Sequence, residues 1–273
     1  MICILATADL FGQAQIYTRR EKLKDITAKI TKVVLSGDEI LDEALKESVA
    51  QSWTMSPYEF CTKDEFEKIK TSEQFYFLLV VKGQERKESE PGIDMLTLVK
   101  GGPGASKSVN DMLEVVTFPL RSATDPDGRE FVMLPAFLSI IQNHAQGLIG
   151  SEFKAYSTLG ASDTKKLKMK QLYFSKEDFA PQVNNRVIES LDEDTYVEEN
   201  SEAVDSVFTK GTFNGVVSYI VAPSEPVDGS VCYKMLIGSD DHKLYWYKKH
   251  RISPRNGAGF LDMDLKAIKL IRK

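Results

Sequence analysis

The residues that most resemble a reactive site form a glycine-rich segment, KGGPGASKS, at 100–108. The segment follows an apolar run and is similar to the loop that cradles phosphates in nucleotide-binding proteins. That loop requires glycine immediately before its lysine, where this chain has Ser106, and it must lead into a helix. Here the next apolar run, 114–120, predicts a second antiparallel strand. We therefore expect no nucleotide site, and instead a glycine-rich turn followed by one helical turn.

The three histidines, His144, His242 and His250, provide few catalytic options. None lies at the spacing from a cysteine, serine or carboxylate that a known catalytic motif uses. His242 follows Asp240 and Asp241, and the three could hold a metal, but such residues also favour tight turns. We favour the turn and predict no metal and no cofactor. An enzyme is not excluded by this, because catalytic groups can come from distant parts of a chain.

The best candidate for a binding surface is the aromatic and basic segment 243–251, KLYWYKKHR. In a regular strand Leu244 and Trp246 share one face, and Tyr245 and Tyr247 share the other. Aromatic side chains beside cations are typical of surfaces that bind a partner or a carbohydrate, although they also simply pack well in strands. The predicted partner surface consists of Tyr245, Trp246, Tyr247, Lys248, Lys249, His250 and Arg251.

Cysteine usage allows one disulfide. If Cys3 belongs to a cleaved leader, Cys61 and Cys232 remain, and an oxidising compartment could join them. The alternative is a pair of buried free thiols. No closely spaced pair of cysteines or histidines indicates a zinc site.

Apolar periodicity predicts the elements that must position these groups, and it gives the same order twice. In the first half the expected strands and helices are 31–36, helix 37–51, 56–62, helix 63–70, 74–82, 93–100, 114–120 and helix 132–144. In the second half they are 169–175, helix 176–191, 195–199, helix 201–208, 216–222, 231–237, 243–252 and helix 261–271. Pro181 is tolerable there if it lies in the first turn of its helix. Both halves also contain Ser-Glu-Pro, at 89–91 and 224–226.

The sequence therefore predicts an α/β fold, of the α+β type with mixed sheets, in two structurally related halves. Each half has the order strand, helix, strand, helix, a three-stranded antiparallel meander and a helix. The expected bounds are 15–146 for the first repeat, 147–166 for a linker and 167–273 for the second repeat. We interpret the repeated order as an internal duplication, in which 31–141 and 169–270 superpose with most strands equivalent.

Composition and charge narrow the class of protein. Hydrophobic residues make up 42% of the chain and charged residues 27%, as in ordinary globular proteins. The net charge of -5 gives no reason to expect nucleic acid. Acidic residues gather at 189–202 and basic residues at 243–273, and we interpret these runs as solvated faces or as a docking surface. No segment is apolar for long enough to predict a transmembrane helix.

The first residues, MICILATADLFGQA, resemble a leader. An apolar stretch precedes small residues at the spacing that a signal peptidase reads, so residues 1–14 are predicted as a truncated signal peptide cleaved after Ala14. Asp9 and the missing basic start oppose this interpretation, and a first strand or helix is the alternative. We expect an exported protein, periplasmic or secreted, or a cytoplasmic one if 1–14 is not a leader.

Three stretches, 36–66, 96–102 and 231–253, are similar to an uncharacterised family of exported proteins from Bacteroides-type bacteria. The resemblance covers nearly the whole chain after the leader. It implies a location in the cell envelope or outside the cell. It implies no activity, ligand or catalytic residue.

Together these features predict a non-catalytic exported protein of the cell envelope that acts in binding or as a scaffold. Its partner would be an unknown envelope protein or a small ligand, bound in a cleft between the halves. The alternative is an envelope hydrolase with an unrecognised active site in that cleft. A third possibility is a structural subunit of a larger assembly.

Overall fold

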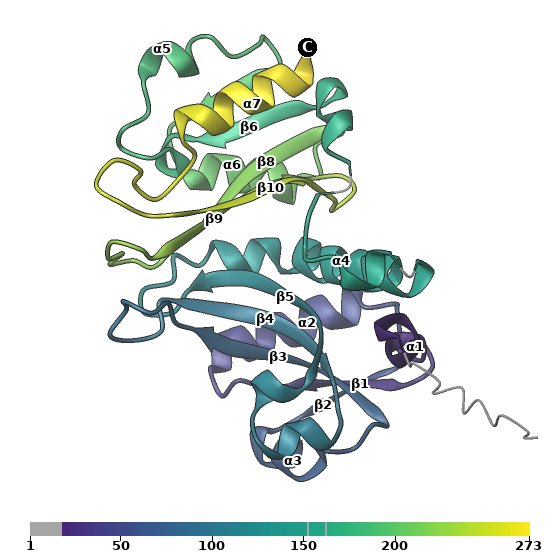
Figure 1. The fold of residues 1–273 in the computed structure, drawn as a ribbon. Helices are drawn as coiled ribbons and strands as arrows, with labels where there is room; N and C mark the ends of the chain where they lie inside the picture. Colours follow the sequence, from purple (N-terminus) through teal and green to yellow (C-terminus); the bar gives the residue numbers. More distant parts are fainter. Residues whose placement is uncertain (1–17, 152, 162) are drawn as a thin grey trace, which may run out of the picture.

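The computed structural model describes residues 18–151, 153–161 and 163–273. Two five-stranded mixed sheets, each followed by helices, form an α/β fold of two similar halves (Figure 1), which confirms the predicted fold class. The predicted leader, 1–14, lies outside the described residues. In the part of the chain that the structure describes, no helix combines the length and the apolar character needed to cross a lipid bilayer.

The first half begins with a short helix and then builds the first sheet. Its elements are α1 (Arg19–Leu23), β1 (Ile30–Val34), α2 (Glu39–Ser52), β2 (Tyr58–Cys61), α3 (Lys63–Ile69), β3 (Phe75–Gly83), β4 (Ile93–Lys100), β5 (Leu113–Ser122) and α4 (Arg129–Gly150). The strand order is β2-β1-β3-β4-β5. β1 is parallel to both of its neighbours, and β3, β4 and β5 form the predicted antiparallel meander.

The second half repeats this arrangement. Its elements are β6 (Gln171–Ser175), α5 (Asn185–Ile188), β7 (Thr195–Glu198), α6 (Ser201–Thr209), β8 (Gly215–Val221), β9 (Val231–Gly238), β10 (Leu244–Arg251) and α7 (Asp262–Arg272). The order β7-β6-β8-β9-β10 matches that of the first sheet strand for strand. The predicted equivalence of strand order is therefore confirmed, whereas duplication as its origin stays a prediction.

The helix predicted over 176–191 is wrong for most of its length. The structure has a 3₁₀ turn at Lys176–Asp178 and only one helical turn, α5, at Asn185–Ile188. Between them Phe179 forms a parallel bridge with Phe260, and the amide of Ala180 donates to the Phe260 carbonyl at 3.0 Å. This pairing holds the backbone extended directly before Pro181, which cannot donate a helical hydrogen bond.

Helices α2 and α3 of the first half begin with side-chain caps. Asp38 caps α2, accepting from the amide of Leu41 at 3.2 Å. The Ser36 hydroxyl, in the same turn, donates to Asp42 at 2.7 Å. Thr62 and Glu65 form a reciprocal capping box at the start of α3. These local bonds fix where the helices leave the strands.

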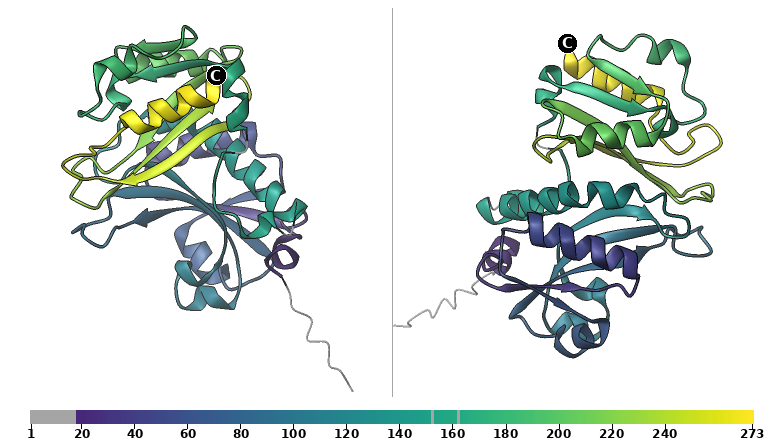
Figure 2. Two further views of the ribbon diagram at one scale, coloured as in Figure 1. Left: turned by 45° about the horizontal axis from the view of Figure 1, so that its top comes forward. Right: turned by 180° about the vertical axis from the view of Figure 1, so that it is seen from behind.

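Helix α4 is the central element of the molecule and lies between the two sheets (Figures 1 and 2). With α2 it covers one face of the first sheet, and its opposite side packs against α6 and the second sheet. Phe137 of α4 contacts Phe118 of β5, with ring centroids 4.7 Å apart, and Tyr219 of β8, at 5.2 Å. One hydrophobic cluster therefore runs through both halves.

The two sheets are covered differently on the face that carries α3 or α6. In the first half, Ala105 and Met112 of the glycine-rich connection pack over Phe77 and Val99 on that face. In the second half the equivalent connection is only a tight turn at 239–243. There α4 packs over the part of the sheet that this short turn does not cover. The long connection thus covers in the first half the area that α4 covers in the second.

The glycines of this connection have a packing role. A side chain at Gly101 would place its Cβ 2.1 Å from the carbonyl oxygen of Ser72, and one at Gly104 would lie 2.2 Å from that of Asp111. The connection joins antiparallel strands and includes 3₁₀ turns at Pro103–Ser106 and Val109–Asp111, in agreement with the predicted turn and helical segment. Close backbone approach accounts for both glycines.

An ionic cluster also joins the halves. Arg129, at the start of α4, donates to Asp178 at 2.9 Å and to Asp205 of α6 at 3.1 Å, and it contacts the Ser218 carbonyl at 3.0 Å. Its neighbour Glu130 points to the first half and accepts from Arg121 at 3.0 Å. The first turn of α4 is therefore bonded to both halves through buried charges.

The segment predicted as a linker, 147–166, begins within the last turn of α4. It continues through a 3₁₀ turn at Lys154–Tyr156 and enters another at Thr164–Met169. Ala155 is fully buried against the first half. The described part of this segment is thus packed along α4, and it contributes residues to the site described next.

Candidate functional site

The predicted partner surface on β10 is only partly accessible. Tyr245 and Trp246 are buried, with 2% and 3% of their surface exposed, whereas Lys248, Lys249 and Arg251 are exposed. The strand also contains a β-bulge at Tyr245, so Leu244 and Trp246 lie in different hydrophobic clusters and the predicted shared face is wrong. A bulge shifts the alternation by one residue. Trp246 stacks on Phe260 in the core of the second half.

The remaining residues of that surface face two directions. Lys248 lies over the ring of Trp246 at 5.4 Å, and His250 bonds the Gly257 carbonyl at 2.9 Å, so both belong to the α7 side of the sheet. Tyr247 and Lys249 lie on the opposite side, toward the first half. The structure therefore divides the predicted surface and assigns Tyr247 and Lys249 to a pocket.

Cys61 and Cys232 are buried free thiols in different halves, so the disulfide that the sequence allowed is not formed. Cys61 packs on the α3 side of the first sheet. Cys232 accepts a hydrogen bond from the amide of Gly259, and burial raises the pKa of its thiol to about 11. Both thiols are therefore structural in character.

The Asp-Asp-His segment forms the predicted tight turn. His242 has a φ of 52° and stacks on Phe208 at 5.3 Å, while Asp241 accepts from Tyr245 at 2.6 Å. Asp240 accepts from the amide of Asn214 at 2.9 Å. Across the described residues no group of three ligand side chains is placed to hold a metal ion.

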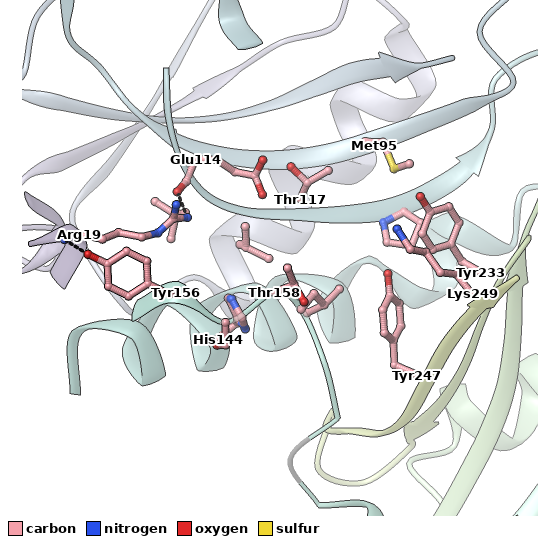
Figure 3. A pocket seen from close by; sticks show the side chains of 15 residues that line it. Arg19, Met95, Glu114, Thr117, His144, Tyr156, Thr158, Tyr233, Tyr247 and Lys249 are labelled. Atoms are coloured by element: carbon pink, nitrogen blue, oxygen red, sulfur yellow. Dashed lines mark hydrogen bonds between the residues drawn. The ribbon is translucent and has the colours of Figure 1, made fainter. Parts of the chain in front are cut away.

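A pocket of about 390 Å³ lies where the two halves meet (Figure 3), and we call it the junction pocket. Side chains from both halves and from the segment after α4 line it. They are Arg19 of α1, Met95, Glu114 and Thr117 of β4 and β5, His144 of α4, Tyr156 and Thr158 of the segment after α4, and Tyr233, Tyr247 and Lys249 of β9 and β10. The volume falls within the roughly 300–1,000 Å³ typical of small-molecule sites.

One end of the junction pocket is cationic. The Arg19 guanidinium donates to the Glu114 carbonyl at 2.5 Å, its backbone amide donates to the Tyr156 hydroxyl at 3.3 Å, and its buried Nε has no partner in the described structure. Figure 3 shows His144 beside the Arg19 side chain. Burial and the nearby Arg19 charge lower the pKa of His144, so the imidazole is neutral at pH 7.

The other end combines two tyrosines with an amine. The rings of Tyr233 and Tyr247 lie 6.3 Å apart at a tilt of 30°, and the Lys249 ammonium lies 5.8 Å from the centre of the Tyr233 ring. Burial raises the pKa values of both tyrosines, which therefore stay protonated and can donate. Neither hydroxyl bonds another described residue. The pocket thus offers donors at both ends.

Sequence reasoning identified Tyr247 and Lys249 but missed the rest of the junction pocket. Arg19, His144 and Tyr233 are far apart in the sequence and are brought together only because α4 packs against both halves. A partial signal was present in the repeated order of strands and helices, since pockets often lie at the junction of two such halves. Comparison of the chain with family models, with curated proteins and with solved structures found no match.

Proposed function

We propose that this chain is a non-catalytic binding protein of the cell envelope that holds a small anionic molecule in the junction pocket. The observation that supports this proposal is the excess of hydrogen-bond donors around that pocket. Arg19 and Lys249 are cations, and the hydroxyls of Tyr233 and Tyr247 are protonated and unpaired among the described residues. A ligand rich in acceptors, above all one with a carboxylate, would satisfy them.

Binding is better supported than hydrolysis, the alternative. Hydrolysis would require a base beside a nucleophile, or two carboxylates placed as an acid and a base. Around the junction pocket as described, Glu114 is the single carboxylate, and the His144 ring has no hydrogen-bonded carboxylate or serine. These features favour a site that holds its ligand unchanged.

The test is calorimetric titration with galacturonate, benzoate and glucose 6-phosphate, three small anions with different rings. Lys249→Met should weaken binding about tenfold or more, because a hydrogen bond to a charged group is lost. Lys248→Met is the matched control, since the neighbouring lysine lies over Trp246 and away from the pocket. Equal binding by the two variants, or no binding of any probe, would contradict the proposal.

The export part of the proposal has separate support. The leader-like stretch 1–14 and the resemblance to exported proteins both favour it. Mass spectrometry of the protein from its natural host tests it directly. A chain that begins at Gln15 supports export, and an intact Met1 contradicts it.

A further inference from the structure

A second pocket adjoins the junction pocket and continues from it. It has a volume of about 480 Å³ and shares His144, Ser157, Thr158 and Leu159 with the first. Residues 157–161, which we call the strap, run between the two pockets. A molecule longer than one ring could therefore extend from the junction pocket past His144 into this adjoining pocket.

The adjoining pocket adds two further cations. Lys154 is exposed and makes no ion pair in the structure as described. The Lys243 side chain is 44% exposed, and among the described residues its ammonium pairs only with Asp241, at a long distance of 3.7 Å. The acidic side chain that lines this pocket, Asp163, is already paired with Lys166 at 2.7 Å. In the junction pocket Arg19 and Lys249 outnumber the Glu114 carboxylate, so the net charge that a ligand meets is positive on both sides of the strap.

On these observations we propose that the ligand is an acidic oligosaccharide, whose successive carboxylates meet the cations on either side of the strap. The inference rests on the proposed function and names its ligand class. Lys249 and Arg19 serve the part in the junction pocket, and Lys154 and Lys243 serve the part in the adjoining pocket. His144 lies between these two parts.

The remaining side chains fit sugar rings. Tyr233 and Tyr247 present aromatic surface with polar ends, which suits the apolar faces and hydroxyl rims of sugars. Thr117 and Thr158 add hydroxyls that can both donate and accept, and the Ser157 hydroxyl, which donates to the Lys154 carbonyl at 2.8 Å, can accept. An extended acidic peptide fits less well, because such peptides pair with a free strand edge. Two edge strands, β5 and β10, line the pocket, and on β5 the Glu114 carbonyl already accepts from Arg19.

The test is calorimetric titration with galacturonate and with its dimer, trimer and tetramer. We expect affinity to rise about tenfold or more from monomer to tetramer, as each added carboxylate meets a cation. The double variant Lys154→Met/Lys243→Met should bind the tetramer no better than the dimer, because Lys249 and Arg19 remain, and should bind the monomer as the unaltered chain does. Both lysines are on the surface, so the fold is retained.

The outcomes separate the two proposals. Monomer binding that depends on Lys249, with no gain from chain length, would overturn the oligosaccharide and leave the proposed function standing. Absence of binding by every small anion would overturn the proposed function. Tetraglutamate that binds as tightly as the tetramer would show that the ligand is an acidic peptide, and a neutral galactose tetramer that does so would show that charge is not what is recognised.

Discussion

Replacing Arg129 by methionine should greatly weaken the contact between the halves. The Arg129 side chain has 6% of its surface exposed, and its guanidinium bonds Asp178 at 2.9 Å and Asp205 at 3.1 Å. Methionine fills similar volume but leaves both carboxylates without a counter-charge. Removing one partner of a buried ion pair costs about 3–5 kcal/mol. That is a large share of the roughly 5–15 kcal/mol that stabilises an ordinary protein.

The loss should also depend on pH. Burial raises the pKa of Asp178 even beside Arg129, and loss of the cation raises that pKa further. A carboxyl whose pKa is higher in the folded than in the unfolded state binds more protons when folded, so stability falls as pH rises between those two pKa values. The deficit of Arg129→Met should therefore be larger at about pH 8 than at about pH 5.

Urea unfolding followed by circular dichroism at the two pH values measures both effects. The double variant Arg129→Met/Asp178→Asn should recover part of the loss, because it removes the unpaired buried charge. Lys248→Met, which removes an exposed cation of the second half, should change the free energy of unfolding by less than about 0.5 kcal/mol. A loss below about 1 kcal/mol for Arg129→Met, or the same loss at both pH values, would refute the reasoning.

Three further predictions concern single sites. In urea unfolding, Gly104→Ala should lower the free energy of unfolding by more than about 2 kcal/mol, because its Cβ would lie 2.2 Å from the Asp111 carbonyl oxygen. The control Gly150→Ala has open space around it and should leave the free energy of unfolding unchanged. Cys232 should resist iodoacetamide in the native protein and react in urea, because its thiol is buried and burial raises its pKa to about 11. Mass spectrometry measures the labelling, and fast labelling of the native protein would contradict the burial of this thiol. Galacturonate should bind about threefold or more tightly at about pH 5 than at about pH 7.5, because His144 gains a proton and a positive charge as pH falls through its lowered pKa. The His144→Gln variant should lose this dependence, and an unchanged pH profile would contradict the role given to the imidazole.

Much of the fold could be predicted from the sequence because strand patterns and their order are local properties. The apolar runs of β3 and β8 and the antiparallel meanders after them are visible in the chain itself. The helix over 176–191 could not be excluded, because the pairing of Phe179 with Phe260 that replaces it joins residues far apart in sequence. Tertiary contacts decided that segment over local propensity.

The candidate site was less predictable for a related reason. The bulge at Tyr245 changes which side chains of β10 share a face, and no turn residue or glycine marks it in the sequence. The junction pocket depends on α4 packing against both halves, which brings Arg19 and His144 near Tyr233. Periodicity shows that α4 is apolar but not that it contacts two sheets.

A crystal structure of the chain grown with the galacturonate tetramer tests the central claim most directly. We predict that the sugar chain lies in the junction pocket with one carboxylate within hydrogen-bond distance of Lys249, and that it continues past His144 toward Lys243. A tetramer bound elsewhere on the surface, with Tyr233 and Tyr247 making no contact to it, would contradict the account.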